Sequence, residues 1–492
     1  MKTTRKLSLF AVSDIIGLAI GTVMSPITTR LLTPAQYGAI PVVSAIWVMF
    51  AVFQFGTMDY SFPFFSSHSS KWGKGNVHLT STRLSVIGAS ITWRMFGGWL
   101  IISGYGTQRA GLQAVEVVVY IVSLLPLILN GWQLYIMRYE LMAVEFTKLT
   151  ILGRVLPPIM SIPPILLVSQ EDRLLVQLGF GCVANWIAYA WGARLLKGNR
   201  NDKESCVIDR RLAKEMLRYG LLLVPGGVIY SSFTAVDRFL LSSFRTAPEM
   251  AIFVLASSIG GIALIFKSWF SRVFDPLLVR WVAEKQPEQL KMKLQGTLNV
   301  LALGMSLIAL MSLLWSKYIV RLLYPSEYQD AAFVIPVVVM AGVLSSLSLV
   351  FIAAPLIAQK AKYHIPVYTI GLIVNAIFGL VLIPPHGVAG AAWGTLFGEG
   401  AILFAWIFIG RYVLKNVSLR MGIAATMVTV SILCVLISSI APITMSLKYT
   451  AILTLAVILI AVPLFFHIIR QNSWLQAIAS SVRKKESKTS LH

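Results

Sequence analysis

"DAAFVIPVVVMAGVLSSLSLVFIA", residues 330–353, carries its only charged side chain, Asp330, at its first position. A run of this length and polarity can cross a hydrocarbon layer ~30 Å thick as a helix. Comparable runs recur from one end of the chain to the other; 57% of the 492 residues are hydrophobic and only 13% are charged. Soluble chains carry about 25% charged residues, so the sequence indicates a polytopic membrane protein.

The apolar runs predict an all-α membrane fold with about fourteen transmembrane helices. They are continuous rather than alternating with period two, which favours helices over a barrel. The predicted spans are residues 7–30, 39–62, 83–104, 113–134, 147–168, 174–195, 219–242, 250–271, 296–317, 330–353, 363–384, 387–410, 421–442 and 448–469. Only the tight turn "PPHG" separates the eleventh span from the twelfth.

The 42 Lys and Arg residues are distributed unevenly across this topology. If the N-terminal "MKTTRK" is cytoplasmic, most of them fall in cytoplasmic segments, as the positive-inside rule requires, and both termini are cytoplasmic. The net charge of +22 then reflects topology and attraction to anionic headgroups. Nucleic-acid binding is disfavoured, because the basic residues are spread over short loops.

The longest hydrophilic stretch, residues 194–218, follows six predicted helices and is strongly basic. It suggests an N-terminal six-helix lobe, a basic cytoplasmic linker, a C-terminal six-helix lobe, two additional helices and a basic cytoplasmic tail. Their respective bounds are 1–196, 197–218, 219–412, 413–470 and 471–492. Repeated lobes that rock around a midplane site are a common transporter design.

Four segments in combination resemble the polysaccharide-biosynthesis family. They are "RLLTPAQYG" (30–38), "YGLLLVPGG" with "DRFLL" (219–227 and 237–241), "LLYPSEYQDAAFVIPVV" (322–338) and "LIPPHGVAGAAWGTLFGEG" (382–400). This family contains O-antigen (Wzx-type) flippases and belongs to the superfamily of MATE multidrug exporters and lipid II flippases. The resemblance covers residues 1 to about 412.

The resemblance implies two six-helix lobes around a V-shaped cavity, with transport by alternating access. It implies a polyprenyl-pyrophosphate-linked oligosaccharide as cargo, moved across the bacterial inner membrane for O-antigen, capsule or exopolysaccharide assembly. Membrane lipids and other polysaccharide-assembly proteins are the further partners expected. The last two helices go beyond the twelve-helix core, and fourteen-helix members are a known variation.

The sequence contains no pattern for catalysis or nucleotide hydrolysis. GxxxxGK[ST], HExxH, CxxC and GxSxG do not occur, and the three cysteines are isolated. We therefore expect a transporter without enzymatic activity, cofactor or metal. One alternative is a MATE-type exporter of small cations, which the scarcity of midplane acids disfavours. Another is an integral-membrane polysaccharide polymerase or ligase, which the short external loops disfavour.

Charges inside the spans are the candidate cargo contacts, because each costs about 2.5–3.5 kcal/mol at the bilayer centre unless it faces a cavity or a partner. Arg94, in the third span, either binds the pyrophosphate through its guanidinium fork or pairs with a buried carboxylate such as Glu399 in the twelfth. Arg154 and Lys267, in the cytoplasmic halves of their spans, either line a basic inner mouth or snorkel to the headgroups.

Three acids are candidates for ion coupling: Asp14, Asp59 and Glu399. A first-helix acid takes part in proton or sodium coupling in the MATE branch, which favours Asp14 by resemblance. The alternative is that Asp14 is an inner-mouth acid that faces water or a nearby basic residue. Three arginines near external helix ends, Arg30, Arg238 and Arg321, are candidates for the outer mouth or interface anchors.

"RVLPPIMSIPPILL", residues 154–167, places Pro157–Pro158 and Pro163–Pro164 in the fifth span. Because proline removes a backbone donor and disfavours helical geometry before it, this span is predicted to be broken, as a hinge or a static kink. Small-residue stripes predict close helix packing. They are Ser13, Gly17 and Gly21 in the first span, and Gly390, Gly394 and Gly398 in the twelfth.

Overall fold

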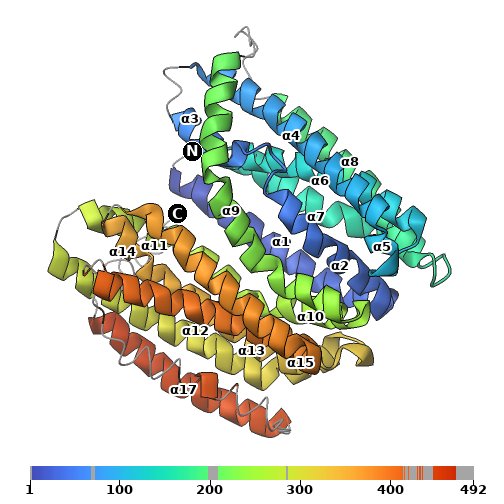
Figure 1. Ribbon diagram of the computed structural model, residues 1–492. Helices are drawn as coiled ribbons and strands as arrows, with labels where there is room; N and C mark the ends of the chain where they lie inside the picture. The colour runs from blue at the N-terminus through green and yellow to red at the C-terminus, as the bar shows by residue number, and fades with distance from the viewer. Residues whose placement is uncertain are drawn as a thin grey trace, which may run out of the picture. The chain divides into compact units, whose positions relative to one another are not determined.

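The computed structural model describes residues 3–67, 72–197, 209–283, 286–358, 360–413 and 447–471, together with residues 415, 419, 429, 431–433 and 435. Within these residues every regular element is a helix, and nine helices are long and apolar enough to cross a membrane (Figure 1). The predicted all-α polytopic fold is confirmed. The predicted span 421–442 and the tail 471–492 fall almost wholly outside the described residues.

The chain divides into two compact units, Met1–Val254 and Leu255–His492. The first contains α1 Thr3–Leu31, α2 Pro34–Ala51, α3 Met58–Ser67, α4 Lys74–Ser103, α5 Tyr105–Gln108, α6 Ala114–Tyr139, α7 Ala143–Ile165, α8 Arg173–Lys197, α9 Arg210–Phe244 and the start of α10 Ala247–Gly260. Helix α8 packs against α6 and α7, and α7 packs against α1. Helix α9 packs against α2, α3 and α4.

The second unit is built around α13, most of which is buried. Its elements are α11 Ile262–Ala283, α12 Pro287–Leu323, the 3-10 turn η1 Ser326–Tyr328, α13 Ala331–Phe351, α14 Ala353–Ile357, the 3-10 turn η2 Ala361–Tyr363, α15 His364–Phe408, the π-turn η3 Ile409–Val413 and α17 Leu447–Gln471. Helix α13 contacts α11, α12 and α15, and α17 packs on α12. The predicted eighth span, 250–271, is shared between α10 and α11.

The segment "RLLTPAQYG" joins α1 to α2, and its Thr, Pro and Gly residues each have a structural role in this junction. Thr33 caps α2: its hydroxyl accepts the Gln36 N–H at 3.2 Å, while the Gln36 side-chain oxygen accepts the Thr33 N–H at 3.1 Å. Pro34 occupies the first turn, where its missing N–H is harmless. Gly38 is required by packing, because a Cβ there would lie 1.8 Å from the Ala247 carbonyl oxygen.

The segment "RLLYPSEYQ" (321–329), which repeats five of the nine residues of "RLLTPAQYG", also joins two helices. Helix α12 ends at Leu323, Pro325 precedes η1, and α13 begins at Ala331. The repeated phrase is thus a helix-to-helix junction used in both units.

Helix α9 packs on α3 through glycines of the "YGLLLVPGG" segment. A Cβ on Gly220 would lie 2.3 Å from the Thr57 hydroxyl oxygen, and one on Gly227 would lie 1.9 Å from the Tyr60 hydroxyl oxygen. Helix α9 begins at Arg210, within the stretch that the sequence assigns to a linker, because Asp209 caps it by accepting the Arg211 N–H at 2.8 Å.

The predicted continuous span 39–62 is wrong. Helix α2 ends at Ala51 and α3 begins at Met58. Between them, Gly56 and Thr57 have φ values of +56° and +66°, which a right-handed helix does not allow. Gly56 lies directly against α4, since a Cβ on Gly88 would be 2.3 Å from the Gly56 nitrogen. Close packing of this turn on α4 fixes the break.

The turn predicted at "PPHG" is confirmed. The residues of α15 form two helices across a kink at Gly387, whose φ is +54°. The two halves touch through the predicted glycine stripe: a Cβ on Gly390 would lie 2.2 Å from the Leu382 carbonyl oxygen, and one on Gly394 would lie 3.2 Å from the Gly379 nitrogen. Close packing explains this stripe.

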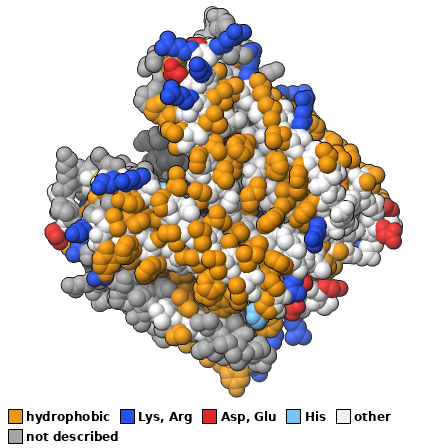
Figure 2. Space-filling view, in the orientation of Figure 1, with side chains coloured by type: hydrophobic (Ala, Val, Ile, Leu, Met, Phe, Trp, Pro, Cys, Tyr) orange, Lys and Arg blue, Asp and Glu red, His pale blue; other side chains and the backbone are white. Residues whose placement is uncertain are grey.

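The surface agrees with a helix bundle surrounded by hydrocarbon. Figure 2 shows hydrophobic side chains over broad areas of the visible face, while Lys and Arg gather at places such as the start of α9. That end of α9 has the sequence "RRLAKEMLR". Basic side chains at helix ends can reach lipid headgroups.

The Gly38 contact generates a stability prediction. Gly38→Ala should destabilise the protein by about 1–3 kcal/mol, the usual range for overpacking, and lower its melting temperature by several degrees. Gly21→Ala is the matched control, because an added Cβ there meets nothing within 4 Å. Thermal unfolding of the purified protein in nanodiscs measures both variants. Equal melting temperatures for Gly38→Ala and the unchanged protein would contradict the close contact.

Candidate functional site

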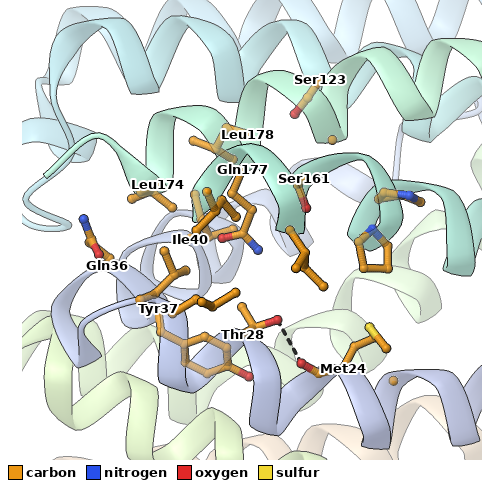
Figure 3. Close-up of a pocket in the computed structure, with 18 of the residues that line it drawn as sticks. Met24, Thr28, Gln36, Tyr37, Ile40, Ser123, Ser161, Leu174, Gln177 and Leu178 are labelled. Carbon is orange, nitrogen blue, oxygen red and sulfur yellow. Dashed lines mark hydrogen bonds between the residues drawn. The ribbon is translucent and has the colours of Figure 1, made fainter. Parts of the chain in front are cut away.

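The first unit contains a cavity of about 450 Å³ between α1, α2, α7 and α8. Its walls are mostly apolar, formed by side chains such as Met24, Ile40, Leu174 and Leu178 (Figure 3). Polar groups are interspersed among them. They come from Thr28, Gln36, Ser123, Arg154, Ser161, Gln177 and Asn185. A concave, largely apolar site with a few polar groups is the usual form of a ligand-binding cavity.

Among the described residues, Arg154 is the only charged one that lines this cavity. It stands midway along α7, and not in the cytoplasmic half of its helix, because α7 begins four residues before the predicted span 147–168 and ends three residues before its end. The other α7 residues of the lining follow Arg154 toward the C-terminal end of the helix. The cavity therefore extends from Arg154 to Gln36 and Leu174, near the starts of α2 and α8. The predicted topology places these helix ends on the external side of the membrane.

Helix α1 supports Arg154 at a glycine. A Cβ on Gly17 would lie 3.8 Å from the Arg154 Cγ and 3.9 Å from its Nε, so the arginine stem crosses α1 at this point. One turn later Gly21 lines the cavity, and a Cβ there would meet open space. At Gly17 an added Cβ would make only ordinary van der Waals contacts, and Gly21 lines the cavity, so the close packing predicted for the first-span stripe is not seen at either glycine.

The predicted break at the paired prolines is wrong. Helix α7 is continuous from Ala143 to Ile165 and contains all four prolines. Pro157 and Pro158 line the cavity. Each proline frees a carbonyl one turn earlier, and a membrane helix tolerates this loss beside a cavity or a protein neighbour. A hinge role for these prolines remains a prediction.

The second unit brings together two predicted residues that the sequence treated separately. The Lys267 ammonium on α11 donates to the Ser345 Oγ on α13 at 2.6 Å. Glu399, on α15, lies close enough to both groups for its carboxylate to interact electrostatically with the Lys267 ammonium and the Ser345 hydroxyl. Both charged side chains are half-buried. We call these three residues the Lys267–Ser345–Glu399 cluster.

Ser345 differs from the other buried serines of α13. Ser346 and Ser348 donate to the carbonyls of Gly342 and Leu344 in their own helix. Ser345 instead accepts a hydrogen bond from Lys267, on the neighbouring helix α11. Its role could not be read from the sequence, because "SSLS" presents three similar hydroxyls.

Three other predicted cations lie at exposed positions. Arg94 is exposed on α4 beside Ile91 and Met95, which are 53% and 61% exposed. No ion pair of Arg94 occurs within the described parts of the chain. Arg30 and Arg321 are exposed at the ends of α1 and α12.

The other predicted residues have local surroundings. Arg238 is half-buried, and its backbone N–H donates to the buried Asp237 carboxylate at 2.7 Å. Asp59 lies in the first turn of α3, where the backbone N–H groups of Asp59 and Tyr60 face its carboxylate. The Asp14 side chain lies outside the described residues.

Sequence reasoning missed the uncharged polar residues of the cavity. Gln177 and Asn185 are eight residues apart on α8, and therefore lie close to one face of that helix. Polar side chains on one face of an apolar span were the signal that could have identified them.

The chain has the fold of known flippases and transporters. A structure of lipid II flippase MurJ in an inward closed conformation matches it with a TM-score of 0.69 and 13% identity, covering 95% of this chain and 99% of that one. Inward-facing and outward-facing structures of a multidrug resistance MATE family transporter of the MOP superfamily match with TM-scores of 0.60 and 0.59 and identities of 14% and 15%. Each match covers 84% of this chain, together with 98% of the inward-facing chain and 96% of the outward-facing chain.

No model of a protein family and no curated protein sequence matches the chain. At these identities the structural matches establish the fold alone. They agree with the predicted MATE-like, polytopic all-α architecture.

The cavity generates a labelling prediction. In a variant without Cys182, Cys206 and Cys434, a cysteine at Asn185 should react with a water-soluble thiol reagent, because Asn185 lines the cavity. The matched control is Ala184→Cys, since Ala184 is 0% exposed on the same helix. Mass spectrometry of protein in nanodiscs measures the extent of modification. Equal labelling at both positions would contradict the described cavity.

Proposed function

We propose that this chain is a flippase for a polyprenyl-pyrophosphate-linked oligosaccharide, and that it moves this cargo from the inner to the outer leaflet of a bacterial inner membrane. It acts by alternating access during cell-surface polysaccharide assembly, as a transporter and not as an enzyme. The observation that carries the proposal is Arg154, a cation at the middle of α7 that lines a largely apolar cavity.

The chemistry of this cavity suits an amphipathic anion. Moving a pyrophosphate through hydrocarbon without compensation is prohibitively costly. A guanidinium supplies a permanent charge and a fork of N–H donors that matches phosphate oxygens. The amides of Gln177 and Asn185 and the Ser161 hydroxyl add uncharged hydrogen-bonding groups of the kind that sugars use. Apolar walls suit the first part of a prenyl chain.

The fold supports the same conclusion. The similarity to lipid II flippase extends over nearly the whole of both chains, so this chain offers the architecture on which a lipid-linked cargo can be moved. Arg94 remains a second candidate contact for the pyrophosphate, and Asp14, Asp59 and Glu399 remain candidates for ion coupling. Cytoplasmic termini, and contacts with other polysaccharide-assembly proteins, belong to this proposal.

A MATE-type exporter of small cations is the alternative that the structural similarity also favours. The cavity argues against it, because Arg154 would repel a cationic substrate. The alternative predicts that cationic drugs, and not prenyl pyrophosphates, stabilise the purified protein.

Arg154 provides the test of the proposed function. Arg154→Ala should weaken the binding of farnesyl pyrophosphate about tenfold or more, the loss expected when hydrogen bonds to a charged group are removed. It should also abolish flipping of a prenyl-pyrophosphate-linked sugar in proteoliposomes, whereas Arg154→Lys retains part of both. Arg211→Ala is the control, since the Arg211 side chain is 80% exposed at the start of α9 and does not line the cavity. Normal binding and flipping by Arg154→Ala would refute the assignment.

A further inference from the structure

Polar groups of the first-unit cavity form two layers. Helices α7 and α8 pack against each other and run antiparallel, because only residues 166–172 connect them. Arg154 lies 11 residues before the end of α7, and Asn185 lies 12 residues after the start of α8. Ser161 and Gln177 each lie four residues from the same two ends. We call Arg154 with Asn185 the Arg154 layer, and Ser161 with Gln177 the Gln177 layer.

An apolar stretch separates the two layers. Their members are seven residues apart along α7 and eight apart along α8, which corresponds to about 10–12 Å at the helical rise per residue. The lining between them includes Pro157, Pro158, Leu178 and Gly181. A ligand that engages both layers must therefore carry two polar parts that are well separated from each other.

The Gln177 amide carries an acceptor that the fold does not use. Its Oε1 atom is buried and has no hydrogen-bond partner within the part of the chain that the structure describes. The side chain extends from α8 into the cavity (Figure 3). Gln36, another glutamine of the lining, differs: its Oε1 accepts the Thr33 N–H at 3.1 Å, and its Nε2 donates to the Gln170 carbonyl at 2.7 Å. Because a buried acceptor without a donor is costly, Gln177 suits a ligand that supplies one.

We propose that Gln177 recognises the glycan of the cargo, and that the cargo binds with its pyrophosphate at the Arg154 layer and its sugars at the Gln177 layer. The Gln177 Oε1 accepts a hydrogen bond from a sugar hydroxyl or from the N–H of an acetamido sugar. The opposite orientation places the prenyl chain at the Gln177 layer and leaves this acceptor unpaired against hydrocarbon. The inference rests on the proposed function, because it takes Arg154 as the contact of the pyrophosphate.

Gln177 then gives the cavity a specificity that a guanidinium alone does not provide. A site built around a buried hydrogen-bonding group rejects a ligand that lacks the matching group, because the protein group is left unpaired. The cavity should therefore distinguish a glycosylated prenyl pyrophosphate from a bare one. Arg154 should bind the pyrophosphate of both.

Two probes test this specificity on the full-length protein in nanodiscs. One is farnesyl pyrophosphate, and the other is farnesyl pyrophosphate that carries two N-acetylglucosamine units. Gln177→Met should weaken binding of the glycosylated probe about three- to tenfold, the range for one neutral hydrogen bond, and leave farnesyl pyrophosphate binding unchanged. Microscale thermophoresis measures both affinities. Equal weakening of the two probes, or no weakening of either, would overturn the inference.

Gln36→Met is the matched control, because it removes a glutamine whose amide is bonded within the fold. It should lower the melting temperature of the protein and leave the ratio of the two affinities unchanged. Gln177→Met should lower that ratio without lowering the melting temperature, because it removes no hydrogen bond of the Oε1 atom. The same change in the ratio for both variants would show a structural effect and contradict recognition by Gln177.

Cysteine protection tests the orientation without relying on the Gln177 amide. In a variant without native cysteines, both probes should protect Asn185→Cys from a water-soluble thiol reagent, because the pyrophosphate occupies its layer. Only the glycosylated probe should protect Gln177→Cys. Protection of Gln177→Cys by farnesyl pyrophosphate would place the prenyl chain there and refute the orientation. Failure of the glycosylated probe to protect it would do the same.

Arg154→Ala separates the inference from the proposed function on which it rests. If this variant binds both probes as the unchanged protein does, the proposed function fails and the inference fails with it. If it weakens the binding of both probes while Gln177→Met weakens neither, the proposed function stands and the inference alone fails.

Discussion

A charge inside a hydrocarbon layer must be compensated, and the two units of this chain do so in different ways. In the second unit Glu399 interacts electrostatically with Lys267, and Lys267 donates a hydrogen bond to Ser345. In the first unit Arg154 lines a cavity, and no ion pair of Arg154 is found among the described residues. A cation that lines an accessible cavity favours an anionic ligand.

Close backbone packing holds these charges in position. Gly38 touches the backbone of Ala247, Gly220 touches Thr57, and Gly390 touches the backbone of Leu382. Each glycine belongs to one of the segments that carry the family resemblance. Helices without a hydrophobic force between them associate through such contacts, because only small residues let backbones approach. The segments that carry the resemblance therefore owe it largely to packing residues, and specificity must come from the side chains between them.

The sequence predicted helix positions well because a long apolar run in a membrane is stable only as a helix that satisfies its own backbone hydrogen bonds. For example, α13 at Ala331–Phe351 falls within the predicted span 330–353. It failed where tertiary contacts override local preference. Gly56 breaks a run that appears continuous because it packs against α4, and the four prolines of α7 leave the helix intact. Charged site residues were identifiable because a charge in an apolar run is costly. Ser345 and Gln177 were not, because a single hydroxyl or amide looks the same in a cavity and in a packed interface.

A transporter must bind its cargo strongly enough to remove it from one leaflet and weakly enough to release it into the other. A permanent guanidinium alone would favour capture, since its charge cannot be switched off near neutral pH. The other described residues that line the Arg154 cavity are uncharged, so release requires the cargo to be separated from one cation there.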